Sequence, residues 1–314
     1  MGPDSFTFQS VDEAGIFARK WVPAGKPIGV VQIVHGMAEH SARYEAFASL
    51  LVDEGYIVYA NDHRGHGETA GCEENLGYFA DENGWELVVD DLYELTKIIK
   101  ERHSGCPVFL FGHSMGSFLV RRYVQKYGNE VAGIILSGTG ADQGMLSFVA
   151  IGIAKREIRK HGKQARSELL TRLSFGNYNK SFEPRRTEFD WLTRDEKEVD
   201  RYVEDPYCGA VATAGFYYDM LVGLKLLDKP ARLKQMPRDL PVFFVSGDKD
   251  PVGNYTKGVL KVVRHFRKAG IRDIDVKFYK EGRHELLNEL NKEEVHQDIV
   301  RWLGTKNEKG KNSS

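Results

Sequence analysis

Short and almost continuously apolar runs recur along the first third of the chain and again near its end. They are separated by segments with a helical spacing of apolar residues, of which Tyr44, Phe47, Leu50 and Leu51 are one example. Apolar runs of this length are typical of parallel strands that are buried on both faces. The pattern therefore predicts an α/β fold, with a mostly parallel central sheet between helices. The predicted strands cover residues 28–34, 57–60, 108–111, 133–136, 241–245 and 274–279.

The alternation stops after the fourth predicted strand and resumes at the fifth. Residues 141–236 contain helical patterns and loops but no apolar run that predicts a buried strand. We therefore predict a core in two parts, residues 1–139 and 237–304, with a helical cap inserted at 140–236. The end of the chain, residues 305–314, is polar, and we expect it to be disordered.

The predicted cap contains an apolar segment followed by a basic one. Residues 145–154 are almost entirely apolar, whereas residues 155–172 carry many more basic than acidic side chains. We favour an apolar helix that packs on the core, followed by a solvated charged helix, since charged helices are common on protein surfaces. The alternative is peripheral contact of the cap with an anionic lipid surface.

Composition narrows the choice of partners and compartment. The chain has 314 residues, of which 41% are hydrophobic and 28% charged, as is ordinary for a globular protein with a sizeable core. Its formal net charge of -1 provides no field that recruits nucleic acid, so we expect no nucleic-acid partner. Three cysteines without a C-x-x-C pair favour a reducing compartment. No apolar run has the length of a signal peptide or a membrane span, and we expect a cytoplasmic protein.

The first chemical signal is the pentapeptide G-x-S-x-G, formed by Gly112, His113, Ser114, Met115 and Gly116. It stands between a predicted strand and a predicted helix, and that context makes a short pattern specific. The turn is so tight that side chains at its flanking positions would clash, hence glycine, and the serine hydroxyl is exposed at the carboxyl end of the sheet. Ser114 is therefore the candidate nucleophile.

A serine hydroxyl becomes a good nucleophile only when a neighbouring base accepts its proton. The loop after the strand at 241–245 carries Asp248 and Asp250, and the loop after the next strand carries His284. The order serine, acid, histidine is the order of this kind of catalytic triad. We assign His284 as general base and acid, and Asp250 as the carboxylate that holds its tautomer. Asp248 follows the strand so closely that we expect it to bond backbone amides of the turn.

The tetrahedral intermediate of acyl transfer needs two backbone N–H groups aimed at its negative oxygen. We expect one from Met115, the residue after the nucleophile, and one from Met37 in the loop after the first long strand. Gly36 would let that backbone approach closely. His35 is interpreted as a structural residue of the loop.

Residues 61–67 (NDHRGHG) contain two histidines in a glycine-rich turn and have some likeness to a metal site. Zinc sites need further cysteine, histidine or carboxylate ligands at recognisable spacing, and none follows here. We interpret this segment as a turn braced by Asp62 and Arg64, and we expect neither a metal nor another cofactor.

Taken together, the runs at 35–44 (HGMAEHSARY), 62–67 (DHRGHG) and 112–116 (GHSMG) resemble the monoacylglycerol lipase and lysophospholipase family of α/β-hydrolases. Segment 198–208 and the motifs GDKDPV and GRHELLNE are similar to that family too. The resemblance extends from about Phe17 to Leu303, which is nearly the whole chain.

This resemblance implies the α/β-hydrolase fold and a helical cap that forms an acyl-chain tunnel. It also implies Ser114, Asp250 and His284 as the triad, with the amides of Met37 and Met115 as the oxyanion donors. We therefore expect a serine hydrolase that cleaves a monoacylglycerol or a lysophospholipid through an acyl-enzyme on Ser114.

Other enzymes share this machinery. A carboxylesterase or thioesterase for shorter acyl chains would use the same residues, and so would a proline-type peptidase acting on an amide. From a different class, the fold can serve as a ligand-binding module with a broken triad. That reading is disfavoured here, because each catalytic position is filled by a competent residue. The sequence does not specify the oligomeric state.

Overall fold

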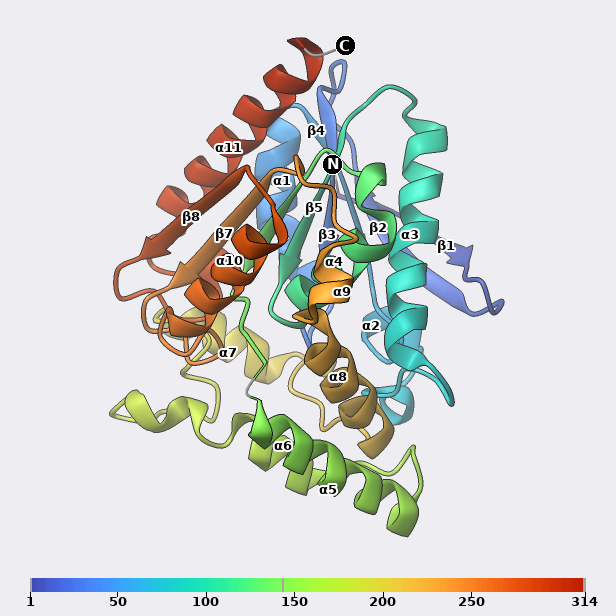
Figure 1. Ribbon diagram of the computed structural model, residues 1–314, viewed down its shortest axis with the longest axis vertical. Coiled ribbons are helices and arrows are strands. Elements are labelled where there is room, and N and C mark those ends of the chain that lie inside the picture. Colours follow the sequence, from blue (N-terminus) through green and yellow to red (C-terminus); the bar gives the residue numbers. More distant parts are fainter. Residues whose placement is uncertain (1, 143, 313–314) are drawn as a thin grey trace.

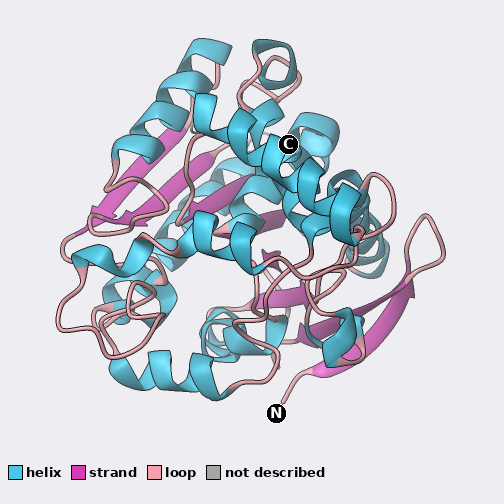
Figure 2. Ribbon diagram, turned by 90° about the horizontal axis from the view of Figure 1, so that it is seen from below, coloured by secondary structure: helices cyan, strands magenta, loops and turns pink. Residues whose placement is uncertain are grey.

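The computed structural model describes residues 2–142 and 144–312, which contain an eight-stranded sheet between two layers of helices (Figure 1, Figure 2). The strand order is β1-β2-β4-β3-β5-β6-β7-β8; β2 runs antiparallel to both β1 and β4, and the other neighbours are parallel. The strands are β1 (Asp4–Gln9), β2 (Gly15–Trp21), β3 (Gly29–Val34), β4 (Tyr56–Asn61), β5 (Val108–His113), β6 (Gly133–Ser137), β7 (Val242–Gly247) and β8 (Ile274–Tyr279).

The helices alternate with the parallel strands, as the apolar pattern predicts. They are α1 (Glu45–Asp53), α2 (Gly67–Ala70), α3 (Gly84–Arg102), α4 (Met115–Tyr127), α5 (Met145–His161), α6 (Glu168–Phe175), α7 (Glu196–Glu204), α8 (Ala214–Leu227), α9 (Pro230–Leu233), α10 (Lys257–Ala269) and α11 (Lys292–Asn312).

Both faces of the sheet are covered by helices. Successive residues of each central strand point to opposite faces, so each strand contributes side chains to two cores. In β3, Val30 and Val34 join a large core with α3, α4, α8 and α10, whereas Val31 and Ile33 join a second core with α1 and α11. This arrangement explains why the strand reads as an uninterrupted apolar run.

The sequence analysis missed the two strands at the N-terminus. Strands β1 and β2 form an antiparallel edge in which few residues are buried, namely Phe8 in β1 and Ile16, Ala18 and Trp21 in β2. Alternation such as that of Ile16 and Ala18 is the signal of a half-buried strand, and it is weaker than a solid apolar run. The turn between them supplies Asp12, whose carboxylate pairs with Arg64.

Residues 61–67 form a braced turn, but Asp62 and Arg64 brace it with different partners. The carboxylate of Asp62 accepts hydrogen bonds from the amides of Ser41 and Glu68. The guanidinium of Arg64 instead pairs with Asp91 on α3 and with Asp12. The turn is therefore tied to three other segments, which are the β1–β2 turn, the turn before α1, and α3.

The inserted segment divides into two kinds of structure. Helices α5, α6 and α7 lie beyond the carboxyl ends of the parallel strands, and α5 and α6 lie side by side below the sheet in Figure 1. Helix α8 also packs against α3 and α4, where Gly223 leaves room for the ring of Trp85. The division of the chain at residues 140 and 236 stays a prediction.

The apolar half of α5 packs on the core only in part, because Ile153 and Ala154 join it whereas the first turns of the helix are exposed. Met145, Leu146, Phe148 and Val149 are 82%, 66%, 61% and 57% exposed. Within residues 2–142 and 144–312, no helix combines the length and the apolar character that crossing a bilayer requires. The exposed residues therefore form an apolar surface on the cap.

The prediction of disorder from residue 305 onward is wrong for the part of this segment that the structure describes. Helix α11 continues to Asn312, and the side chains of Lys306 and Asn307 are buried against the core. Lys306 pairs with Asp273, and the Asn307 amide donates to the carbonyl of Ile28 at 2.9 Å. Polar composition misled the prediction, because these polar groups find partners on the sheet. Residues 313 and 314 lie outside the described residues.

Candidate active site

Ser114 occupies the turn between β5 and α4, the place that the pentapeptide predicts. Its φ of +50° and ψ of -119° are unusual for a residue with a side chain, and backbone strain of this kind recurs at functional sites. Glycine is required on both sides of it. A Cβ on Gly112 would lie 2.7 Å from the carbonyl oxygen of Gly116, and a Cβ on Gly116 would lie 2.0 Å from that of Val34.

Asp250 and His284 meet beyond the ends of β7 and β8. The Nδ1 atom of His284 lies 3.0 Å from Oδ1 of Asp250, which also accepts a hydrogen bond from the amide of Val252 at 2.9 Å. Both side chains are buried. Among the residues that the structure describes, no polar atom bonds to the other ring nitrogen of His284, Nε2. That nitrogen is therefore available to accept a proton.

The surroundings of His284 hold its ring in place. Burial lowers the pKa of His284, but the hydrogen-bonded carboxylate of Asp250 outweighs burial, and the net pKa is raised above 6.5. The ring of Trp191 lies 5.1 Å from that of His284, and the ring of His113 lies 4.7 Å from it. A Cβ on Gly138 would lie 2.9 Å from the ring of His284, so only glycine leaves it room.

His113 sits next to the nucleophile but does not act as a second charge. Burial, together with the neighbouring His284, lowers the pKa of His113 to about 4. It is therefore neutral at neutral pH and serves as a packing surface for the His284 ring.

The loop after β3, which carries the predicted oxyanion residue Met37, lies against the nucleophile. A Cβ on Gly36 would lie 3.2 Å from the Cβ of Ser114. Ala38 has a φ of +55°, and its carbonyl accepts hydrogen bonds from the hydroxyl of Tyr202 and the amide of Gly209, both in the inserted segment. The second predicted donor, Met115, is buried at the first position of α4.

A cavity of about 350 Å³ opens onto Ser114 and His284. Its walls come from the loop after β3, from α6 and from the loops around α7. Apolar and aromatic side chains alternate there with charged ones. The apolar group includes Met37, Phe175, Phe189, Trp191, Leu192 and Val211, and the charged group includes Glu168, Arg172 and Glu188.

Two clusters contain residue types that ligate metals. His35, His63 and His66 stack on one another, and the Nε2 atom of His35 accepts a hydrogen bond from the amide of His63. Burial lowers the pKa of each of the three, so they are neutral structural groups.

The second cluster consists of His40, Asp205 and Cys208, whose ligand atoms lie within 4.8 Å of one another. His40 is already bonded to Asp205 at 2.8 Å, and burial raises the pKa of the Cys208 thiol. A protonated thiol is a poor metal ligand. The His40–Asp205 contact joins the loop after β3 to the inserted segment.

Several residues around Ser114, Asp250 and His284 carry no signal in the sequence that predicts a role. Trp191 and Tyr178 come from a cap segment without apolar periodicity, so no pattern points to them. Glu39 and Arg43 stand in the run at 35–44, and the signal for Glu285 was its place directly after His284. Their contacts depend on loops from distant parts of the chain.

Comparison with known proteins assigns this chain to a family. Residues 25–291 match the family described as serine aminopeptidase, S33. The chain belongs to the serine aminopeptidase S33 family. Its relatives include the monoacylglycerol lipase of Mycolicibacterium smegmatis, 29% identical over 95% of this chain and 95% of that protein, and the human monoglyceride lipase, 26% identical over 96% and 92%.

Similar solved structures confirm the α/β-hydrolase fold. A thermostable carboxyl esterase from Bacillus coagulans, solved in complex with glycerol, superposes with a TM-score of 0.90 at 29% identity and covers 98% of this chain and 99% of its own. A lipase in an open form superposes with a TM-score of 0.85 at 27% identity, covering 97% of this chain and 99% of its own.

Proposed function

We propose that this protein is a carboxylic ester hydrolase of the monoacylglycerol lipase type, with Ser114 as nucleophile and Asp250 and His284 completing the triad. The observation that carries the proposal is the buried His284–Asp250 pair, whose ring borders the same cavity as Ser114. The similar lipases and carboxyl esterase support the choice of an ester as the bond that is cleaved.

In the proposed mechanism Ser114 Oγ attacks the ester carbonyl while His284 Nε2 takes the hydroxyl proton. The amides of Met37 and Met115 would stabilise the negative oxygen of the tetrahedral intermediate. His284 then returns the proton to the departing alcohol, which leaves an acyl group on Ser114. Water, activated by the same imidazole, hydrolyses this acyl-enzyme. Each step uses only side chains and amides of this chain, the ester and water, so the proposed route needs no cofactor.

The cavity supports a lipid-like substrate with a neutral head. Its apolar walls suit an acyl chain, and about 350 Å³ is within the range of pockets for small molecules. Glu168 and Glu188 outnumber Arg172 among the charged lining groups, which disfavours a phosphate group near them. We therefore propose monoacylglycerol as the substrate class, with lysophospholipid as the second candidate.

Hydrolysis of p-nitrophenyl esters from acetate to palmitate tests this function, with Ser114→Ala as the control. The expected result is activity that rises toward medium or long chains and falls by about 10³- to 10⁶-fold in the variant. A monoacylglycerol and a lysophospholipid of equal chain length then compare the head groups. Activity confined to short esters indicates a general carboxylesterase, and cleavage of an aminoacyl amide instead of esters indicates a peptidase.

We further propose that the exposed apolar surface of α5 contacts a lipid surface while substrate is taken up. Met145, Leu146, Phe148 and Val149 are exposed together, and the basic residues of the following turns could face anionic head groups. Replacing Leu146 and Phe148 by serine is expected to weaken binding to vesicles of anionic phospholipid. Leu290→Ser, which changes a side chain exposed by 61% in the turn before α11, is the matched control. Equal binding of both variants and the natural chain contradicts this proposal.

We also propose that the protein is located in the cytoplasm. Cys72, Cys106 and Cys208 are free thiols, which supports a reducing compartment such as the cytoplasm. Localisation of the tagged full-length protein in its own cell tests this proposal, and a signal confined to an exported fraction contradicts it.

A further inference from the structure

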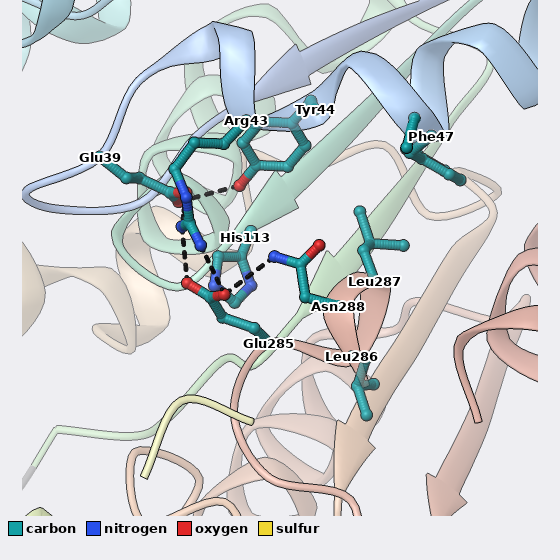
Figure 3. A pocket seen from close by; sticks show the side chains of 10 residues that line it. Glu39, Arg43, Tyr44, Phe47, His113, Glu285, Leu286, Leu287 and Asn288 are labelled. Carbon is teal, nitrogen blue, oxygen red and sulfur yellow. Dashed lines mark hydrogen bonds and ion pairs between the residues drawn. The ribbon is translucent and has the colours of Figure 1, made fainter. Parts of the chain in front are cut away.

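Arg43 lies in the short turn before α1 and joins two loops that flank the candidate triad (Figure 3). Its guanidinium donates two hydrogen bonds to the carboxylate of Glu285, at 2.7 and 2.8 Å. A third, at 2.8 Å, goes to the carboxylate of Glu39. The Arg43 side chain is only 11% exposed, and the two carboxylates are less exposed still.

The first of these loops is the oxyanion loop. Glu39 accepts hydrogen bonds from the amide of Gly36 and from the hydroxyl of Tyr44, in addition to the one from Arg43. Gly36 is the neighbour of Met37 and lies against Ser114. The orientation of Glu39 therefore fixes the backbone that presents the Met37 amide.

The second loop carries the histidine. Glu285 directly follows His284, and its carboxylate also accepts a hydrogen bond from Asn288 at 2.9 Å. Its amide donates to the carbonyl of Leu192 in the inserted segment at 2.7 Å. Arg43 thus holds the residue next to the general base from the side of the oxyanion loop.

Arginine suits this position for physical reasons. Two buried carboxylates would repel each other and raise their own pKa values, unless a cation lies between them. Burial would raise the pKa of Glu285, but the neighbouring guanidinium lowers it to about 2. The planar fork binds one carboxylate with two N–H groups and still reaches the other, which a lysine ammonium cannot do with the same geometry. The guanidinium also stacks on the ring of Tyr202, 4.8 Å from its centroid.

We propose that Arg43 is a positioning residue, which keeps the oxyanion loop and the histidine loop in register through Glu39 and Glu285. The inference rests on the proposed function, because it assumes that His284 is the general base. Arg43 touches neither substrate nor the reacting atoms in this mechanism. It acts on the relative position of the Met37 amide and the His284 ring, where a displacement of about 1 Å can cost on the order of 100-fold in rate.

Arg43 also balances the charge around His284. The carboxylates of Asp250, Glu285 and Glu39 act on the charge of the ring, and the ring of His113 lies against it. Tyr178 of the inserted segment lies near Asp250, and burial keeps it neutral by raising its pKa. Glu285 and Glu39 both raise the pKa of His284, after the larger effects of burial and Asp250. Without Arg43, no guanidinium offsets the negative charges of Glu285 and Glu39. Glu285→Gln instead removes one of these two negative charges. The two changes break the same ion pair but shift the pKa of His284 in opposite directions.

The experiment measures kcat, KM and the pH profile of kcat/KM for Arg43→Gln, Arg43→Lys, Glu285→Gln and the double variant Arg43→Gln/Glu285→Gln. For Arg43→Gln we expect kcat to fall by about 10- to 100-fold with KM nearly unchanged, because positioning acts on the transition state. The acidic limb of its kcat/KM profile, which reports the pKa of His284, should move to higher pH. The same limb of Glu285→Gln should move to lower pH. In the double variant, the acidic limb of the kcat/KM profile should return to the pH of the natural enzyme, but kcat should stay low. Arg43→Lys should show an intermediate kcat and an acidic limb at the natural pH.

Arg64→Gln is the matched control, since Arg64 is similarly buried and pairs with the carboxylates of Asp12 and Asp91. It is expected to lower thermal stability but to leave kcat and the acidic limb unchanged. The inference is overturned if folded Arg43→Gln and Arg43→Lys retain the natural kcat. It is also overturned if the acidic limb of kcat/KM lies at the same pH in all variants. It is also overturned if Arg64→Gln slows the enzyme equally. A failure of the proposed function looks different, because His284→Ala would then keep its activity.

Discussion

The Nδ1 atom of His284 lies 3.0 Å from the carboxylate of Asp250, and both side chains are shielded from solvent. Asp248 is only two residues away, yet its carboxylate accepts a hydrogen bond from the amide of Glu281 at 2.9 Å. The two aspartates of one loop therefore face different partners. One meets the ring that would accept the serine proton, and the other links the ends of β7 and β8.

This difference predicts an order of damage for two isosteric substitutions. Asp250→Asn is expected to lower kcat/KM by about 10³- to 10⁴-fold, because an amide no longer stabilises the charged imidazole or selects its tautomer. Asp248→Asn keeps an oxygen for the Glu281 amide and should stay within about tenfold of the natural enzyme. Steady-state assays on the preferred p-nitrophenyl ester check this order. The reverse order would move the acid role to Asp248.

The raised pKa of His284 predicts the acidic limb of the pH profile. Below its pKa the imidazole is protonated and cannot accept the proton of Ser114, so kcat/KM should rise with pH through an apparent pKa above 6.5. His113 should not contribute to this limb, because its pKa is lowered to about 4. Rates at constant ionic strength between pH 5 and 9 test the prediction, with a non-ionisable ester as substrate. A limb centred below 6.5 contradicts the electrostatic description of the pair.

Four buried histidines predict that the fold loses stability in mild acid. Burial lowers the pKa of His35, His63, His66 and His113, to about 3 for His63 and about 4 for His113. The unfolded chain takes up their protons near pH 6.5, while the folded chain resists them. The stability that these neutral histidines contribute to the folded chain is therefore complete above pH 6.5. As the pH falls below 6.5, the free energy of unfolding decreases by up to about 1.4 kcal/mol per pH unit for each histidine. His284 acts in the opposite sense, since its folded pKa is raised, but it is a single group.

Urea unfolding at pH 7, 6 and 5 measures this effect as the free energy of unfolding. His66→Asn is expected to make the dependence on pH shallower by about one proton. His161→Asn, which changes an exposed histidine, should leave the slope unchanged. A free energy of unfolding that is equal at pH 7 and pH 5 contradicts the prediction.

The sequence could predict the parallel strands and the loops that carry Ser114, Asp250 and His284, because both depend on local patterns. A strand buried on two faces is apolar throughout, and Ser114 is marked by the glycines that its turn requires. The edge strands β1 and β2 were missed because their few buried residues are separated by exposed or partly exposed ones. Alternation over so few residues is a weak signal.

Contacts between distant segments could not be predicted from these patterns. Arg43 and Glu285 are far apart in the chain, and only the folded loops show that a bidentate ion pair joins them. The exposure of Phe148 was missed for a related reason, since an apolar helix reads alike whether it packs on a core or faces outward. Tertiary placement decides both cases, and composition carries little information about it.

The C-terminal helix supplies a last prediction, on stability alone. The Asn307 side chain is 6% exposed, and its amide donates to the carbonyl of Ile28 at the entrance to β3. Asn307→Ala would leave that carbonyl without this donor, at a cost of about 1 to 3 kcal/mol in the free energy of unfolding. Gln297→Ala removes an exposed amide from the same helix and should change stability by less than about 0.5 kcal/mol. Urea unfolding compares the two variants, and both should keep the natural kcat because neither lines the cavity. Equal stability of the two would mean that the end of α11 does not hold the sheet, as its polar composition first suggested.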